Sequence, residues 1–286
     1  MGEGKLPQRR RVTFDSLRQK KAAGERIVML TAYDWGMATV IDQAPVDMVL
    51  VGDSLGMVAL GYPSTIPVTV EDMLHHSQAV RRGVKNALLV GDMPYLSYQI
   101  SEEEAVRNAG RFLKEAGCDA VKIEGDARIA STIARIVSAG IPVMGHIGLT
   151  PQTASSLGQG FTVRGRDLES ARSLVEDAKA LVEAGIFSLV LECIPSALAG
   201  AITERVPVPT IGIGAGPRCD GQVLVTNDLV GMFEKFTPRF VKQYARLAPV
   251  IRDAISEFAR EVTVGAFPGQ ENEFPGGEEV VREIFS

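Results

Sequence analysis

The sequence predicts an α/β fold, a (β/α)8 TIM barrel that forms a single domain. Three observations lead to this prediction: eight short runs of Val, Ile and Leu recur along the 286 residues, amphipathic segments separate them, and no Pro- or Ser-rich linker divides the chain. The runs are almost continuously apolar, which is typical of parallel strands buried on both faces. An open doubly wound sheet is the alternative. It favours a GxGxxG turn after the first strand, and that strand here ends Tyr33-Asp34-Trp35.

The expected strands come from the apolar runs, and the expected helices from capping residues between the runs. The eight strands begin at Ile27, Met48, Ala87, Ala120, Pro142, Phe187, Pro209 and Gln222. Thr69 can cap a helix whose first turn carries acids, and Ser101 with Glu104 fits a capping box. Asp126 and Asp167 begin two further helices. This alternation of strands and helices predicts one barrel.

Residues 1–264 are expected to form the barrel with an N-terminal helical lead-in, and residues 265–286 a C-terminal tail. The lead-in carries a basic cluster between Arg9 and Lys21, which we interpret as a solvated helix ahead of the first strand. The tail is rich in Gly, Pro, Glu and Phe. We therefore expect it to be mobile or to dock on a neighbouring subunit.

The composition excludes several classes of protein. The chain is 45% hydrophobic and 23% charged, so it is too apolar to be disordered. Its net charge of −5 argues against nucleic acid or an anionic membrane as a partner. No apolar run approaches the roughly 18 residues that span a bilayer. Three scattered cysteines, Cys118, Cys193 and Cys219, form no disulfide framework, so we expect a cytoplasmic protein.

Ionisable side chains interrupt five consecutive expected strands at or near their carboxyl ends. They are Asp53 with Ser54 beside it, Asp92, Lys122 with Glu124, His146, and Glu192. Barrels place their sites at this end, so the inward-facing members should meet in one pocket. A single buried acid, or His146 alone, is more often a paired structural group. The constellation as a whole is what indicates a site.

Four carboxylates around one lysine leave an excess of negative charge that a divalent cation can neutralise. Oxygen ligands such as Asp53, Asp92 and Glu124 suit Mg²⁺ rather than zinc. Glu192 lies farther along the chain and is free to act as a base, while Lys122 can stabilise a substrate carboxylate or enolate. The set predicts proton abstraction next to a carbonyl group, with Mg²⁺ as cofactor.

Two other patterns favour structural roles. Gly212, Gly214 and Gly216 in IGIGAG follow the seventh strand, where many barrels bind phosphate, but the next strand lacks a glycine-rich turn to complete such a site. Close packing and a tight turn are therefore the preferred interpretation. His75 and His76 are neighbours on an expected helix and do not face one another, so we expect surface or packing roles.

A series of motifs resembles the ketopantoate hydroxymethyltransferase family. In order they are TAYD, VGDSLGMV, PVTVEDM, VRRG, VKIEG, GHIGLTPQ, LECIP and IGIGAG with CDGQVLV, beginning at Thr31, Val51, Pro67, Val80, Val121, Gly145, Leu191 and Ile211. The resemblance runs from about Val12 to Phe267. Beyond the usual end of the family, the chain continues to Ser286, an extension that we expect to be disordered.

The resemblance implies a Mg²⁺-dependent enzyme of pantothenate biosynthesis, assembled as a homodecamer of paired five-membered rings. It implies transfer of the one-carbon unit of 5,10-methylenetetrahydrofolate to the 2-oxo acid 3-methyl-2-oxobutanoate, giving 2-dehydropantoate and tetrahydrofolate. The family pattern places the metal on Asp53, Asp92 and Glu124, the oxo acid on Asp53, Ser54, Asp92 and Lys122, the proton acceptor on Glu192, and His146 in a supporting position.

Two other functions stay open on the residues alone. Another Mg²⁺-dependent 2-oxo acid aldolase or carbon–carbon lyase would share the acid cluster. The isocitrate lyase-like branch would carry a KKCGH-type loop, which the sequence lacks. A noncatalytic phosphate-binding barrel would give Glu192 and Lys122 no reason to line a pocket.

Overall fold

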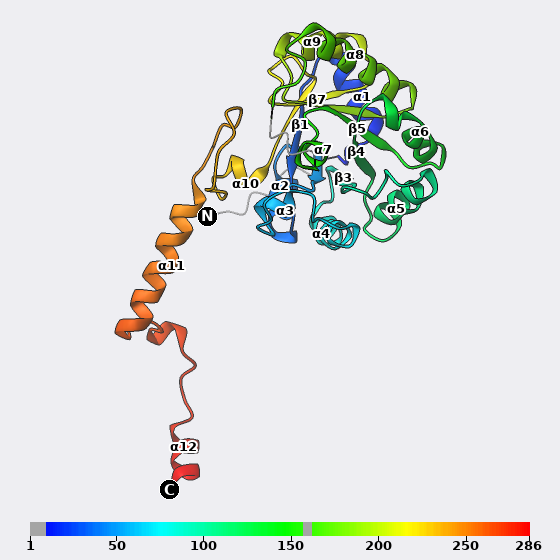
Figure 1. Cartoon of the computed structure of the whole chain (residues 1–286). Helices are drawn as coiled ribbons and strands as arrows, with labels where there is room; N and C mark the ends of the chain where they lie inside the picture. The colour runs from blue at the N-terminus through cyan, green and yellow to red at the C-terminus, as the bar shows by residue number, and fades with distance from the viewer. Residues whose placement is uncertain (1–9, 157–161) are drawn as a thin grey trace.

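The computed structural model describes residues 10–156 and 162–286. Its strands close in chain order into one parallel barrel, with helices packed around the outside (Figure 1). The predicted (β/α)8 barrel is confirmed, and the open-sheet alternative is wrong. The strands are β1 (Ile27–Thr31), β2 (Met48–Val51), β3 (Leu88–Asp92), β4 (Ala120–Glu124), β5 (Val143–Gly148), β6 (Ser188–Glu192), β7 (Thr210–Ile213) and β8 (Gly221–Leu224).

The helices begin where the capping residues predict. Thr69 Oγ1 accepts from the Asp72 amide at 3.1 Å and the Asp72 carboxylate accepts in return from the Thr69 amide at 3.0 Å. Asp126 and Asp167 also act as N-caps, because their carboxylates accept from the backbone N–H groups of Arg128 and Ser170. The helices are α1 (Phe14–Ala23), α2 (Trp35–Gln43), α3 (Leu55–Val58), α4 (Val70–Gly83), α5 (Glu102–Lys114), α6 (Ala130–Ser138), α7 (Pro151–Ser156), α8 (Leu168–Glu183), α9 (Ser196–Arg205), α10 (Thr226–Leu229), α11 (Leu247–Val264) and α12 (Glu278–Phe285), with 3-10 turns at Ala127–Ile129 and Gln270–Asn272.

Two apolar layers hold the barrel together. The larger lies between the strands and the helices, where Met73 of α4 and Phe112 of α5 are fully buried. The smaller fills the barrel interior and includes Met29 and Val90. Each fully buried side chain of this size stabilises the fold by about 1.5–3 kcal/mol. The interior layer is apolar, so the polar strand residues lie above it, at the carboxyl ends.

Helix α1 closes the amino-terminal end of the barrel. Leu17 is fully buried in the interior layer. Lys20 pairs with Asp47 at 2.7 Å and Lys21 with Asp220 at 2.7 Å, both carboxylates lying just before or between strands. The later part of the basic lead-in is therefore a helix, as predicted, but Arg10 and Arg11 precede it, and two of its charges are held in partly buried ion pairs. Arg9 lies outside the described residues.

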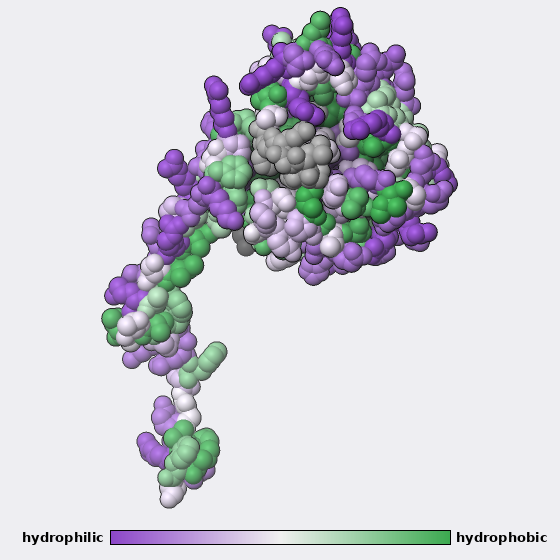
Figure 2. Space-filling view, viewed as in Figure 1, coloured by the Kyte–Doolittle hydropathy of each residue, from purple (hydrophilic) through white to green (hydrophobic). Residues whose placement is uncertain are grey.

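The C-terminal part of the chain leaves the barrel after α10. Helix α11 projects away from the barrel, and α12 lies at its far end (Figure 1). No side chain of α11 is buried against the described part of the chain. Apolar side chains nevertheless cover one face of it (Figure 2), among them Ile255, Phe258 and Val262, each at least 49% exposed. Within the described residues, no helix is both long and apolar enough to span a membrane.

Candidate active site

The pairing of strands β3 to β6 brings the ionisable residues together. Asp92 of β3 lies opposite Lys122 of β4, and Glu124, two residues on, lies opposite His146 of β5. Glu192 ends β6, opposite Gly148. Residues two apart on a strand share a face, so Lys122 and Glu124 both point into the barrel mouth. The predicted convergence at the carboxyl ends is confirmed.

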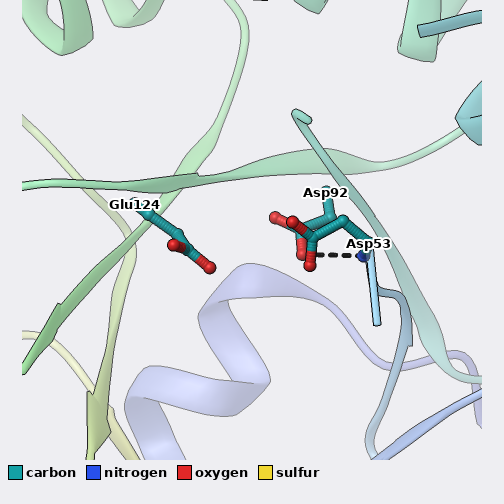
Figure 3. Close-up of side chains that lie close together, drawn as sticks. All are labelled: Asp53, Asp92 and Glu124. Carbon is teal, nitrogen blue, oxygen red and sulfur yellow. Dashed lines mark hydrogen bonds between the residues drawn. The ribbon is translucent and has the colours of Figure 1, made fainter. Parts of the chain in front are cut away.

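A carboxylate triad forms the floor of the mouth. One oxygen each from Asp53, Asp92 and Glu124 lies within 4.8 Å of the others (Figure 3), and all three residues are buried. Asp53 follows β2, and its backbone N–H donates to Asp92 Oδ2 at 3.1 Å. Three buried carboxylates this close repel one another and favour a shared cation.

Lys122 lies against this triad and neutralises only part of its charge. Its Nζ is 2.9 Å from Asp92 Oδ1 and 3.4 Å from Glu124 Oε1. Burial lowers the pKa of Lys122, but the charges of Asp92, Glu124 and Asp53 outweigh it and raise this pKa above its ordinary value. The ammonium group therefore stays charged.

The three carboxyl groups respond differently to this setting. Burial and the neighbouring carboxylates raise the pKa of Asp53 well above its ordinary value, and burial also raises that of Asp92. Burial opposes ionisation of Glu124 too, but Lys122 and His146 lower its pKa to about 2. Asp92 Oδ1 is buried and has no hydrogen-bond partner of acceptable geometry within the described structure. The mutual repulsion of the carboxylates thus acts most strongly on Asp53, because Lys122 pairs directly with Asp92 and Glu124.

His146 connects the triad to Glu192. Its Nδ1 lies 3.4 Å from Glu124 Oε1 and its Nε2 lies 3.2 Å from Glu192 Oε2, an ion-pair contact outside hydrogen-bond angles. Burial and Lys122 lower the pKa of His146, yet Glu124 and Glu192 outweigh them and raise it to about 9. Glu192 therefore joins the cluster through His146. The sequence analysis instead expected Glu192 to lie around Lys122 with the other three carboxylates.

The sequence analysis missed two residues that support the triad. Gln152, on the first turn of α7, donates from Nε2 to Asp53 Oδ2 at 2.9 Å and from its backbone N–H to Glu124 Oε2 at 3.2 Å. Tyr98 donates to Gln152 Oε1 at 2.8 Å. Gln152 ends the motif GHIGLTPQ. Its place shortly after a strand that carries a site residue was the signal available in the sequence.

A cavity of about 530 Å³ opens above the triad and holds the predicted site residues in its wall: Asp53, Ser54, Asp92, Lys122, Glu124, His146 and Glu192. Ser54 Oγ lies 2.9 Å from the Tyr33 hydroxyl, which fixes its position. Cavities of roughly 300–1,000 Å³ are typical of small-molecule sites. The lining is polar at the triad and apolar farther out, so it can hold a charged group beside a hydrophobic one.

The two patterns interpreted as structural have surface or packing roles. His75 is exposed, and His76 of α4 contacts the Tyr33 carbonyl at 2.6 Å and is half-buried, as a surface and a packing role predict. The expectation that the two histidines do not face one another is wrong, because their rings meet edge to face at 5.6 Å. A side chain on Gly212 would clash with Cys219, and one on Gly216 with Ser196, so these glycines permit close packing.

Comparison with known proteins identifies the family. A family model described as ketopantoate hydroxymethyltransferase matches residues 11–270. A 3-methyl-2-oxobutanoate hydroxymethyltransferase from Syntrophomonas wolfei is 57% identical over 275 residues, 96% of this chain and 99% of its own. One from Desulfotalea psychrophila is 59% identical over 254 residues, 89% of this chain and 91% of its own.

Solved structures share the fold at much lower identity. Phosphonopyruvate hydrolase, solved with oxalate and Mg²⁺, aligns with a TM-score of 0.59 at 14% identity, covering 95% of this chain and 94% of that one. A match at this identity establishes the barrel alone. The family model and the relatives at more than half identity go further, and they show that the chain belongs to the ketopantoate hydroxymethyltransferase family.

Proposed function

We propose that the chain transfers a hydroxymethyl group from 5,10-methylenetetrahydrofolate to 3-methyl-2-oxobutanoate, giving 2-dehydropantoate for pantothenate biosynthesis. The observation that carries this proposal is one cavity that holds a carboxylate triad, a buried lysine and a separate glutamate. The name of the relatives, 3-methyl-2-oxobutanoate hydroxymethyltransferase, supplies the oxo acid and the group transferred. The folate donor follows from the resemblance of the motifs.

The triad fits a hard divalent cation such as Mg²⁺. Its donors are all oxygens, they lie within 4.8 Å of one another, and Asp92 Oδ1 has no hydrogen bond of acceptable geometry within the described structure. Asp53, Asp92 and Glu124 would hold the ion. When bound, Mg²⁺ would polarise the ketone of a 2-oxo acid and so acidify the hydrogen on C3.

Lys122 and Ser54 orient the oxo acid in this proposal. The ammonium group of Lys122 is held by two carboxylates and lines the cavity, so its charge is already in place when a substrate carboxylate arrives. The Ser54 hydroxyl, fixed by Tyr33, offers a hydrogen bond beside it. Preorganisation of this kind lowers the entropic cost of reaching the reactive geometry.

Glu192 acts as the base. Its side chain is 15% exposed and lines the cavity, and its Oε2 lies 3.2 Å from His146 Nε2. Glu192 accepts the proton from C3, and the resulting enolate carbon forms the new bond to the one-carbon unit. In the net reaction one water supplies the hydroxyl oxygen of the product, and the folate leaves as tetrahydrofolate.

Deuterium exchange tests the base and the substrate together. The protein is incubated with 3-methyl-2-oxobutanoate and Mg²⁺ in D₂O without folate, and loss of the C3 proton is followed by NMR. We expect exchange that requires the metal and that slows by roughly 10²–10⁴-fold in Glu192→Gln. Glu176→Gln, an exposed position on α8, serves as the matched control. Adding 5,10-methylenetetrahydrofolate should then yield 2-dehydropantoate.

Each outcome separates the possible functions. Exchange followed by product formation supports the transferase. Exchange with no product, together with cleavage of a larger 2-oxo acid, would indicate an aldolase or lyase. Absence of exchange in the unmodified protein would remove Glu192 as base, or 3-methyl-2-oxobutanoate as substrate.

We also propose a homo-oligomer, up to the decamer that the resemblance implies, in which α11 and residues 265–286 dock on a neighbouring subunit. The exposed apolar face of α11 supports this, because stable monomers seldom leave such a face in water. Light scattering should give a multiple of 30.7 kDa, and Phe258→Asp should reduce it. A monomer at all concentrations would contradict the proposal.

Three free cysteines fit the expected cytoplasmic location.

A further inference from the structure

Part of the cavity wall is made of residues outside the proposed oxo-acid site. They are Phe233, Phe236 and Phe240, which follow α10, together with Val225 directly after β8. The rings of Phe233 and Phe236 meet edge to face at 5.5 Å. An aromatic wall of this kind offers ring faces and edges that can pack against an aromatic ring system.

One buried charged residue, Asp228 of α10, lines the cavity together with these aromatic side chains. It is only 8% exposed. Its carboxylate makes no hydrogen bond or ion pair with any described residue, and it stands outside the carboxylate triad. Burial raises the pKa of Asp228 to about 6, so the group is still mainly ionised at neutral pH.

A buried carboxylate without a donor is costly, so its position indicates what should bind there. Two strong donors line the same cavity: Lys122 is already held by Asp92 and Glu124, and the exposed Arg239 makes no ion pair with Asp228. The missing partner must therefore come with a ligand. Two adjacent N–H groups on a flat ring would satisfy both carboxylate oxygens and stack against the phenylalanines at the same time.

We propose that Asp228 binds the 2-amino-4-oxopteridine ring of the folate cosubstrate through its N3–H and 2-amino group. This inference rests on the proposed function and assigns the folate to the aromatic part of the cavity wall. Arg239 lines the same wall and is exposed, so its guanidinium can meet the glutamate carboxylates of the folate tail. The two substrates then approach one another along the cavity, with the oxo acid at the triad.

Steady-state kinetics with Mg²⁺ and saturating oxo acid tests the assignment. In Asp228→Asn, the KM for 5,10-methylenetetrahydrofolate should rise about 10- to 100-fold, because one charged acceptor is lost. The KM for 3-methyl-2-oxobutanoate should not follow it. Asp177→Asn is the matched control, since Asp177 is also 8% exposed but lines a different cavity. An unchanged folate KM in Asp228→Asn would overturn the proposal.

A ligand analogue keeps the test valid if the variant folds poorly. Binding of tetrahydrofolate and of its 2-desamino analogue to the unmodified protein is compared by calorimetry. The analogue lacks one donor, so it should bind at least about tenfold more weakly, and this difference should disappear in Asp228→Asn. Equal binding to the unmodified protein would rule the contact out. A protein that exchanges no C3 proton and forms no product would instead overturn the proposed function.

Discussion

His146 is the side chain that contacts both Glu124 and Glu192. It lies within 3.4 Å of the first and 3.2 Å of the second, and the two acids raise its pKa to about 9 from 6.5. Lys122 Nζ lies 3.1 Å from His146 Nδ1 and lowers this pKa, but the two acids outweigh it, so the metal-free folded protein binds the proton more tightly than the unfolded chain does. The contact with His146 also orients the Glu192 carboxylate.

This elevated pKa gives a stability prediction with a definite sign. The proton stabilises the folded state fully below pH 6.5, and its contribution is lost as the pH rises through about 9. In EDTA, His146→Gln should therefore be less stable than the unmodified protein near pH 6, and the gap should narrow toward pH 10. Urea unfolding at a series of pH values measures it. A gap that widens with pH would contradict the assigned charge.

Asp92 makes the strongest case for a metal ligand. It is 1% exposed, and its Oδ1 has no hydrogen bond of acceptable geometry among the described residues. Asp92→Asn should weaken Mg²⁺ binding by more than roughly tenfold, because even outer contacts of metal sites contribute 10–100-fold. Calorimetric titration with Mg²⁺ measures the change. Asp126→Asn serves as the control, because Asp126 forms a surface ion pair with Arg128. Unchanged affinity would remove Asp92 from the ligand set.

At the scale of elements, the start of α7 holds two members of the carboxylate triad in position. Gln152 binds Asp53 through its side chain and Glu124 through its backbone N–H, so one helical turn fixes two triad members from different strands. Gln152→Ala should lower Mg²⁺ affinity by about 10–100-fold while leaving the triad in place. Gln78→Ala, which removes a hydrogen bond to the Glu115 carbonyl away from the site, is the control. Equal Mg²⁺ affinities for the two variants would show that the contacts of Gln152 do not support the metal site.

The elements also show what a sequence can and cannot predict. The eight apolar runs and the caps at Thr69, Asp126 and Asp167 are local signals, so they locate strands and helix starts. The inward face of each strand follows from its period of two, which is why Lys122 and Glu124 were found. Gln152 was not found, because its partners are 99 and 28 residues away in sequence. Only the closed barrel makes that contact visible.

A related limit concerns Glu192. Sequence alone predicts that it shares a pocket with Lys122, since both strands end at the same rim. The pairing of β5 between β4 and β6 places His146 in the gap, so the base is coupled to the triad through an imidazole. Which side chains become neighbours depends on the order of the strands around the barrel, and no local pattern in the amino-acid sequence gives that order.

At the scale of the whole molecule, the chain has a rigid barrel at one end and an uncovered amphipathic helix at the other. Ile251, Ile255, Phe258 and Val262 follow a helical spacing of four, three and four, so they form one continuous stripe on α11. Burial of such a stripe on a second subunit would contribute a large share of its folding free energy.

The uncovered stripe on α11 makes stability a question of mass action. If subunits associate through α11, each tenfold dilution removes part of the stabilisation that association supplies, so the Tm should fall as the protein is diluted. Phe258→Asp should lower the Tm and abolish its dependence on concentration, which differential scanning calorimetry can follow. A Tm that does not change on dilution would mean that the barrel is self-sufficient. A dependent one would mean that the stability of this fold rises with the concentration of the protein.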